Sequence, residues 1–130
     1  MRRAGVLSVA SVAASLAASS APATAQVSAG GHIYSTQCNA SGYVITSDHP
    51  MVRFIRTDQG PAQLEGRETL YLGKTCDAAR DGLSPGTWCW ANGGFVVDFP
   101  ELSVGFPRQG PECPLGAPNA FSVLDLNCGC

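Results

Sequence analysis

The residues that could most directly do chemistry lie at positions 82–86, which read Gly-Leu-Ser-Pro-Gly. This is the G-x-S-x-G pattern that, in α/β-hydrolases, places a nucleophilic serine on a sharp turn between a strand and a helix. Here Pro85 follows the serine directly, and a chain of 130 residues is too short for that fold. The run is therefore predicted to be a Ser-Pro-Gly turn in which Ser84 has no catalytic role.

An acid–base pair could form at Asp48 and His49, because a carboxylate orients the imidazole ring in many active sites. Adjacent side chains on an extended chain point to opposite faces, however, and Pro50 keeps His49 extended. The stretch is therefore predicted to be a surface turn between two strands. His32 has no better claim to a catalytic role, since it adjoins a polar, glycine-containing lead-in at 26–31 that is predicted to be mobile.

Two pairs of carboxylates have spacings that would matter only on a helix: Glu65 with Glu68, and Asp77 with Asp81. All four are predicted to be solvated loop charges that need no function. We therefore expect no catalytic residue, no cofactor and no metal site, and we expect that the protein is not an enzyme. A small secreted enzyme that uses His49 is kept as the least favoured hypothesis.

The chain contains six cysteines: Cys38, Cys76, Cys89, Cys113, Cys128 and Cys130. An even number in a short chain predicts a disulfide framework if the protein is exported, which the N-terminal pattern described next indicates; the sequence leaves the connectivity open. The alternative is a zinc or copper site that includes His32 or His49, but the chain has no C-x-x-C pair and an oxidising compartment favours disulfides. Cys128 and Cys130 are too close to bridge each other, so each is expected to reach back to a different partner. The pairing expected here joins Cys76 to Cys89 and connects the remaining two cysteines to the terminal pair.

The N-terminus has the features of a secretory signal peptide over residues 1–25. Two arginines at positions 2 and 3 precede an apolar run at 4–18 and an Ala-Thr-Ala cleavage site at 23–25. A membrane anchor is the alternative, but the run is shorter than the ~20 apolar residues that span a bilayer. We therefore expect a periplasmic or secreted protein without a membrane anchor, whose mature chain is a single β domain at 26–130.

The charge of the chain bears on its partners. The full chain has 8 basic and 10 acidic residues, a formal net charge of −2. Loss of residues 1–25 removes two arginines and no carboxylate, so the 105 residues that remain have a net charge of −4. This balance gives no general attraction to nucleic-acid phosphates and argues against nucleic acid as a partner. The partner expected instead is an exported protein or a cell-wall glycan.

Apolar clusters recur every eight to twelve residues through the mature chain, with turn signals between them. The expected strands are 32–37, 43–47, 51–57, 68–73, 87–91, 94–99, 102–106 and 121–126. Their β-branched and aromatic content predicts an all-β fold, a small disulfide-stapled antiparallel barrel or sandwich. The segments around Leu102 and Phe121 could equally be loops packed under a disulfide. A helical turn or two is predicted at 77–80, and four prolines make 107–118 a loop around Cys113.

The strongest local signal is a hairpin within residues 88–99, Trp-Cys-Trp-Ala-Asn-Gly-Gly-Phe-Val-Val-Asp-Phe. The Asn-Gly step at 92–93 predicts a two-residue type I′ turn, which needs positive φ at both positions. Trp90 then lies opposite the first phenylalanine, and both tryptophans share one apolar face with every second residue of 95–99. This face is interpreted as the hydrophobic core. If it were exposed instead, Trp88 and Trp90 would form a platform on which sugar rings could stack.

Three stretches carry a resemblance to known proteins, namely 69–73 (Thr-Leu-Tyr-Leu-Gly), 76–78 (Cys-Asp-Ala) and 88–95 (Trp-Cys-Trp-Ala-Asn-Gly-Gly-Phe). They resemble small exported proteins of proteobacteria, and the resemblance covers about half of the mature chain and implies no activity. More remotely, a small exported barrel with a cysteine-stapled Trp/Phe-Gly hairpin is similar to the C-type lysozyme inhibitor family. That family's signatures include Ser-Gly-x-x-Tyr and Tyr-x-x-x-Thr-Lys-Gly, whereas here residues 41–43 place the tyrosine too early and no Thr-Lys-Gly exists. The inhibitory residues are therefore not carried over.

The lack of a credible set of acid, base and nucleophile favours a binding or inhibitor module that presents loops on a rigid scaffold. We expect it to act on another exported protein, and a mature charge of −4 suits a basic partner such as a lysozyme. The alternative is a carbohydrate- or cell-wall-binding module that uses Trp88 and Trp90.

Overall fold

The computed structural model describes residues 13, 15 and 24–130, so the predicted signal peptide at 1–25 lies almost wholly outside it. The described residues fold into ten strands and one 3₁₀ turn: β1 (Thr24–Val27), β2 (Ile33–Asn39), β3 (Gly42–Ser47), β4 (Met51–Thr57), β5 (Gly60–Gly66), β6 (Thr69–Gly73), β7 (Asp77–Ala79), β8 (Gly86–Ala91), β9 (Gly94–Phe99), β10 (Leu102–Pro107) and η1 (Val123–Asp125). The predicted all-β class is confirmed. Within this part of the chain, no helix is long and apolar enough to cross a membrane.

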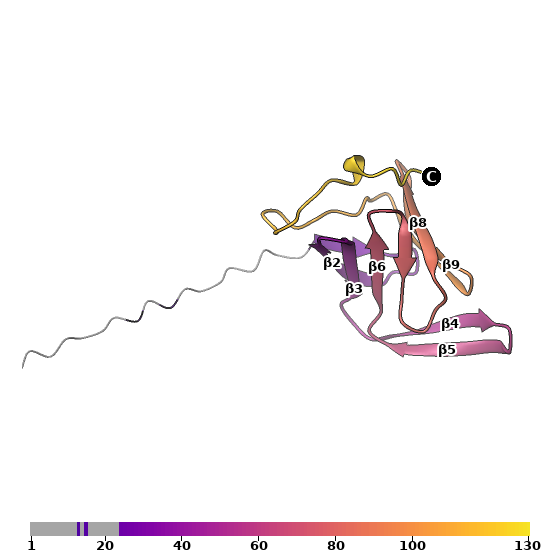
Figure 1. Cartoon of the computed structure of the whole chain (residues 1–130). Helices are drawn as coiled ribbons and strands as arrows, with labels where there is room; N and C mark the ends of the chain where they lie inside the picture. Colours follow the sequence, from indigo (N-terminus) through magenta and orange to yellow (C-terminus); the bar gives the residue numbers. More distant parts are fainter. Residues whose placement is uncertain (1–12, 14, 16–23) are drawn as a thin grey trace, which may run out of the picture.

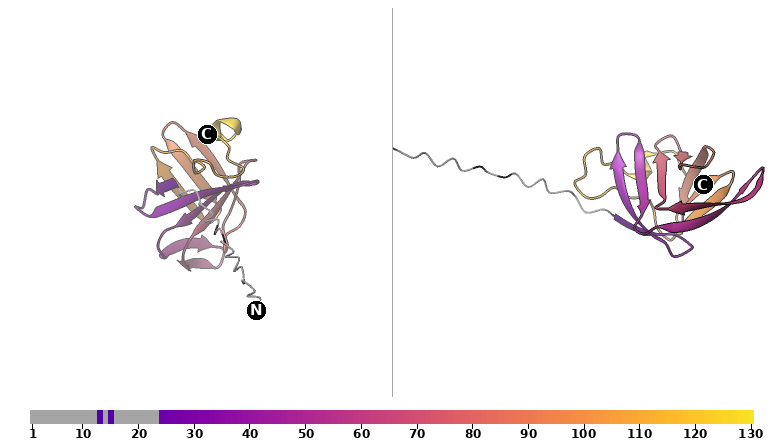
Figure 2. Two further views of the ribbon diagram at one scale, coloured as in Figure 1. Left: turned by 90° about the vertical axis from the view of Figure 1, so that its left-hand side faces the viewer. Right: turned by 90° about the horizontal axis from the view of Figure 1, so that it is seen from below.

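Eight strands form one antiparallel sheet in the order β1-β2-β3-β6-β7-β8-β9-β10, and it curls into a nearly closed barrel (Figures 1 and 2). The two edge strands meet at a seam, where the Ala29 amide donates to the Gly105 carbonyl oxygen over 2.8 Å. The side-chain amide of Gln109 continues the seam, since it accepts from the Val27 amide at 3.0 Å and donates to the Val27 carbonyl oxygen at 2.5 Å. A side chain thus takes the place of a neighbouring strand at the end of β1.

The strands β4 and β5 form a separate two-stranded sheet, paired from Met51 opposite Gly66 to Thr57 opposite Gly60. This hairpin extends past the barrel wall at one end of the molecule, and the C-terminal segment crosses the opposite end (Figures 1 and 2). One face of the hairpin lies on the barrel, where Met51 and Ile55 are buried. The sequence predicted β4 but not β5, because the second strand has no β-branched or aromatic residue.

One apolar cluster fills the barrel: Tyr34, Tyr43, Ile45, Met51, Leu70, Leu72, Ala78, Trp88, Phe95, Val97, Phe99, Val104, Phe106 and Cys128. The apolar face predicted for the β8–β9 hairpin belongs to this core, and Trp90 packs against it. The predicted register is confirmed, since Trp90 lies opposite Phe95 and Trp88 opposite Val97. The rings of Phe95 and Phe106 stack with centroids 4.4 Å apart and so link β9 to β10.

The turn of the β8–β9 hairpin differs from the prediction. Positive φ occurs at Gly94 (+123°) and not at Asn92 or Gly93, so the type I′ geometry is not formed. A Cβ at Gly94 would lie 2.2 Å from the carbonyl oxygen of Phe106, because β10 runs close beside it. Glycine is therefore required at this position both by the backbone conformation and by the neighbouring strand.

Two further predictions of local structure are wrong, and a third segment follows one of the two alternatives left open. The lead-in at 26–31 is not a mobile segment but is tied to the barrel: Gln26 belongs to β1, is buried, and donates from its side-chain amide to the Gly110 carbonyl oxygen at 3.1 Å. Residues 77–79 form strand β7 in place of a helical turn, because they pair with β6 on one side and β8 on the other. For 121–126, where the sequence left a strand and a loop open, the structure has a loop that contains η1.

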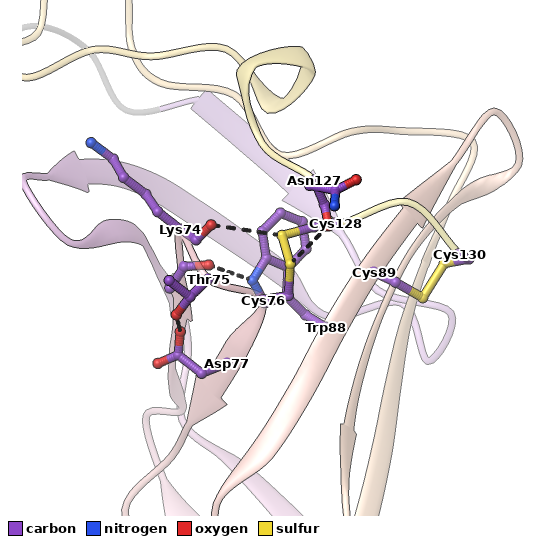
Figure 3. The surroundings of a disulfide bond; sticks show 10 residues. Lys74, Thr75, Cys76, Asp77, Trp88, Cys89, Asn127, Cys128 and Cys130 are labelled. Carbon is purple, nitrogen blue, oxygen red and sulfur yellow. Dashed lines mark hydrogen bonds between the residues drawn. A yellow bond between two sulfur atoms is a disulfide. The ribbon is translucent and has the colours of Figure 1, made fainter.

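The three disulfides are Cys38–Cys113, Cys76–Cys128 and Cys89–Cys130. The prediction that Cys128 and Cys130 tie the C-terminal segment down at two points is confirmed (Figure 3), but the partners expected for them, and the Cys76–Cys89 bridge, are wrong. The oxidised state of all six cysteines is consistent with an oxidising compartment.

The reason for the unexpected pairing is the short length of β7. It pairs only with the first two residues of β8, and the C-terminal segment occupies the place beside the second half of β8. There the Trp90 amide donates to the Cys128 carbonyl oxygen at 2.8 Å, and the Cys130 amide donates to the Trp90 carbonyl oxygen at 2.9 Å. Cys128 therefore lies next to Cys76, and Cys130 next to Cys89, which no local sequence signal shows.

Replacing Gly94 with alanine should lower the free energy of unfolding by at least about 2 kcal/mol, because the φ is strained for any side chain and the Cβ overlaps Phe106. Gly93→Ala is the matched control, since nothing lies within 4 Å of a Cβ there, and it should change the stability by no more than about 0.5 kcal/mol. Urea unfolding of both variants measures the difference. Equal stabilities would contradict the geometry of this turn.

Candidate functional site

A buried carboxylate lies where the β4–β5 hairpin meets the barrel. Glu68, which directly precedes β6, is fully buried and is bound by side chains from three other segments. The Arg53 guanidinium on β4 holds it at two points, from Nη2 to Oε1 at 2.9 Å and from Nε to Oε2 at 3.0 Å. Arg80, which follows β7, donates from Nε to Oε2 at 2.9 Å, and the Tyr34 hydroxyl on β2 donates to Oε1 at 2.6 Å. One carboxylate thus joins four parts of the fold.

The surroundings of Glu68 stabilise its ionised form. Burial by itself raises the pKa of a carboxyl group, but the hydrogen bonds from Arg53 and Tyr34 and the guanidinium charge outweigh burial and lower the pKa of Glu68. Burial and the neighbouring carboxylate raise the pKa of Tyr34, so its hydroxyl keeps the proton that it donates. Both carboxylate oxygens are occupied by donors, so this cluster is suited to anchoring the hairpin and not to proton transfer.

The prediction that Glu68 is a solvated loop charge is wrong. Glu65, Asp77 and Asp81 are exposed as predicted, but Glu65 lies on β5 and Asp77 on β7, and only Asp81 lies in a loop. The signal that would have found Glu68 is the period-two pattern of a strand. Glu68 alternates with Leu70 and Leu72, both of which are buried, so all three side chains lie on one face. Arg53 likewise shares the barrel-facing side of β4 with two buried apolar residues.

The opposite face of the hairpin presents apolar side chains to solvent. Phe54 is 72% exposed and Val52 is 48% exposed, both on β4. Across the ladder they lie opposite Gln63 and Glu65 of β5. Beside Phe54 is a concavity of about 430 Å³, lined by residues 54–57, 60 and 61. Aromatic side chains are enriched in protein interfaces relative to the rest of the protein surface.

The residues considered for nucleophilic or acid–base chemistry are not brought together. Ser84 lies in the turn between β7 and β8, as predicted, and its amide and hydroxyl both donate to Glu101. These hydrogen bonds lower the pKa of Glu101. His49 is exposed in the predicted turn between β3 and β4. Among the described residues, neither its ring nor that of His32 forms a hydrogen bond with a serine or a carboxylate.

The two tryptophans lie in different surroundings. Trp88 is 2% exposed, and its Nε1 donates to the Gly73 carbonyl oxygen at 2.8 Å beneath the Cys76–Cys128 bridge (Figure 3). Trp90 is half-buried and lines a cleft of about 560 Å³ between the end of β8 and the C-terminal chain. A platform of both rings is therefore not formed, and Trp90 alone is accessible to a ligand.

In the described part of the chain, no group of three or more His, Cys, Asp or Glu side chains is placed to hold a metal ion. The chain matches no model of a known protein family, no curated protein and no solved structure. Since no known protein indicates a site, the candidate sites are identified from the structure of this chain. They are the outer face of the hairpin at one end of the barrel and the Trp90 cleft at the other.

Replacing Glu68 with glutamine should destabilise the protein by about 3–5 kcal/mol at neutral pH, because Arg53 and Arg80 lose their counter-charge in a buried place. Glu65→Gln is the control, since the Glu65 side chain is exposed on the same hairpin, and it should have little effect.

The pH dependence gives a second readout. Folding lowers the pKa of Glu68, so its ionisation stabilises the folded protein above the ordinary carboxyl pKa, and this contribution is lost as the pH falls toward the folded-state value. Urea unfolding between about pH 7 and pH 3 should show a flatter acid limb for Glu68→Gln than for the wild type. If Glu68→Gln were as stable as the wild type at neutral pH, the cluster would not anchor the hairpin.

Proposed function

We propose that this protein is a non-catalytic binding module, exported to the periplasm or secreted, that engages another exported protein through the outer face of the β4–β5 hairpin. The observation that carries the proposal is Phe54, a large apolar side chain that is 72% exposed on an element fixed to a disulfide-stapled barrel. Inhibition of a basic enzyme such as a lysozyme is the specific form of the proposal.

The hairpin is fixed to the barrel without any partner. Its barrel-facing side is held by the buried side chain of Ile55 and by the bidentate pair of Arg53 with Glu68. The edge of β4 that does not pair with β5 contacts the β9–β10 turn, where the Arg56 amide donates to the Glu101 carbonyl oxygen at 3.4 Å. A surface that is already ordered loses less conformational entropy when it binds. This supports recognition by a preformed projection.

The outer face has the composition of a small protein-binding patch. Phe54 lies at its centre, with Val52 and Arg56 on either side along β4. The opposite strand contributes Pro61 and Glu65. Aromatic and arginine side chains carry much of the binding energy in protein interfaces, and polar residues commonly form the rim. A partner with an apolar pocket could therefore accept the Phe54 ring while its rim contacts Arg56 and Glu65.

Chemical features of the chain support a role that is exported and non-catalytic. All six cysteines are in disulfides, and residues 1–25 have the pattern of a signal peptide. Among the described residues, neither histidine ring forms a hydrogen bond with a serine or a carboxylate, and the one fully buried carboxylate, Glu68, has both oxygens bound by donors. A mature charge of −4 favours encounter with a basic partner through long-range attraction.

The proposal predicts that the wild-type protein inhibits a C-type lysozyme at micromolar concentration, and that Phe54→Ser weakens binding by about 30-fold, as for loss of an interface hot spot. Lysis of bacterial cells measured by turbidity and binding measured by calorimetry give the two readouts. Tyr71→Ser is the matched control, because Tyr71 is 45% exposed on β6, outside the hairpin, and should bind like the wild type. A wild type without effect on lysozyme, or a Phe54→Ser variant of unchanged affinity, would contradict the proposal.

A further inference from the structure

The cleft beside Trp90 lies at the end of the barrel opposite the β4–β5 hairpin. One wall is formed by residues 90–92 at the end of β8 and the tip of the β8–β9 hairpin. The other walls are formed by 108–113, which follows β10, and by 121–124, which contains η1. The volume of about 560 Å³ falls in the range of small-molecule binding sites in proteins.

Disulfides fix the walls of this cleft. The chain after β10 contains only η1 as regular structure, so few backbone hydrogen bonds hold it. Cys113, itself in the wall, is bonded to Cys38 on β2. The segment that follows the third wall is bonded through Cys128 and Cys130 to the barrel. Cross-links of this kind order a loop before a ligand binds, which makes the cleft a preformed site.

Three polar side chains at the cleft have unused hydrogen-bonding groups. Among the hydrogen bonds and ion pairs of the described residues, none involves the side chains of Asn92, Arg108 or Glu112, although Gln109 beside them is engaged by Val27. Together they offer an amide, a guanidinium and a carboxylate, which bind hydroxyl groups as donors and acceptors. Arg108 also holds a φ of +57°, which is uncommon for a residue other than glycine.

The charges and apolar groups of the cleft decide the class of ligand. Its lining carries one positive group, Arg108, and one negative group, Glu112, so it favours neither an anion nor a cation. Trp90, Phe121 and Leu124 supply an apolar surface next to these polar groups. A saccharide has the matching chemistry, because one face of the ring carries C–H groups that pack on an indole while its hydroxyls reach amides and charged side chains.

We propose that the cleft lined by Trp90, Asn92, Arg108 and Glu112 binds a neutral oligosaccharide. This site uses Trp90 without Trp88 and lies on different elements from the hairpin. It is therefore independent of the protein-binding proposal, and either could fail alone.

Titration of the full mature protein with chitotriose and with maltotriose tests the proposal, with tryptophan fluorescence and calorimetry as readouts. Trp88 is buried, so a change in emission on titration reports on the surroundings of Trp90. We expect a saturable change with at least one of the two sugars and a Kd of about 1 mM. The sugar that binds identifies the source, since chitotriose carries the N-acetylated rings of cell-wall glycans and maltotriose is a plain glucan.

Variants at exposed positions separate the site from the fold. Asn92→Ala and Glu112→Gln should each weaken binding by about fivefold, and both side chains are exposed, so folding should be retained. Phe54→Ser, on the hairpin, should bind the sugar like the wild type. Two outcomes would overturn the proposal: no saturable change with either sugar, or unchanged affinity in both cleft variants.

Discussion

An ionised carboxyl group without access to water constrains much of this structure. Burying such a group costs several kcal/mol unless donors surround it. For Glu68 the donors are Tyr34, Arg53 and Arg80, which come from segments far apart in the chain. Moving β4 away from the barrel would separate Arg53 from Glu68 and leave a buried charge poorly paired. The orientation of the hairpin, and with it the outward direction of Phe54, therefore follows from the hydrogen bonds of one side chain.

The parts of the fold that the sequence predicted depend on neighbours in the chain. Alternating burial and turn residues are local, so most strands of the barrel, the β8–β9 register and the core face of Trp88 could be predicted from them. Strands β5 and β7 could not, because they contain few strand-forming side chains and are extended only through the strands beside them. The alternation that put Leu70 and Leu72 in the core also applied to Glu68, but a charged residue is expected to be exposed unless its partners are known.

The candidate sites were harder to predict than the fold, since both depend on contacts between distant segments. The exposure of Phe54 follows only from the way β4 packs, because the face of β4 opposite Phe54 lies on the barrel. The Trp90 cleft exists because the C-terminal chain passes beside β8, and no residue near position 90 indicates this. The two ends of the barrel are also held by different means. Charge and hydrogen bonds fix the hairpin at one end, and covalent bonds fix a chain with little regular structure at the other.

The contact between the C-terminal segment and β8 also bears on self-association. Without residues 128–130, the second half of β8 would expose unpaired amide and carbonyl groups beside Trp90, because β7 begins only at Asp77, opposite Thr87, and does not reach them. An open strand edge next to apolar side chains is a template for pairing with another copy of the chain and for aggregation. The last three residues close that edge, and two disulfides hold them there. The terminal cysteines thus keep the edge of β8 covered and oppose strand pairing between copies of the chain. Reducing conditions would break the two disulfides and remove this protection.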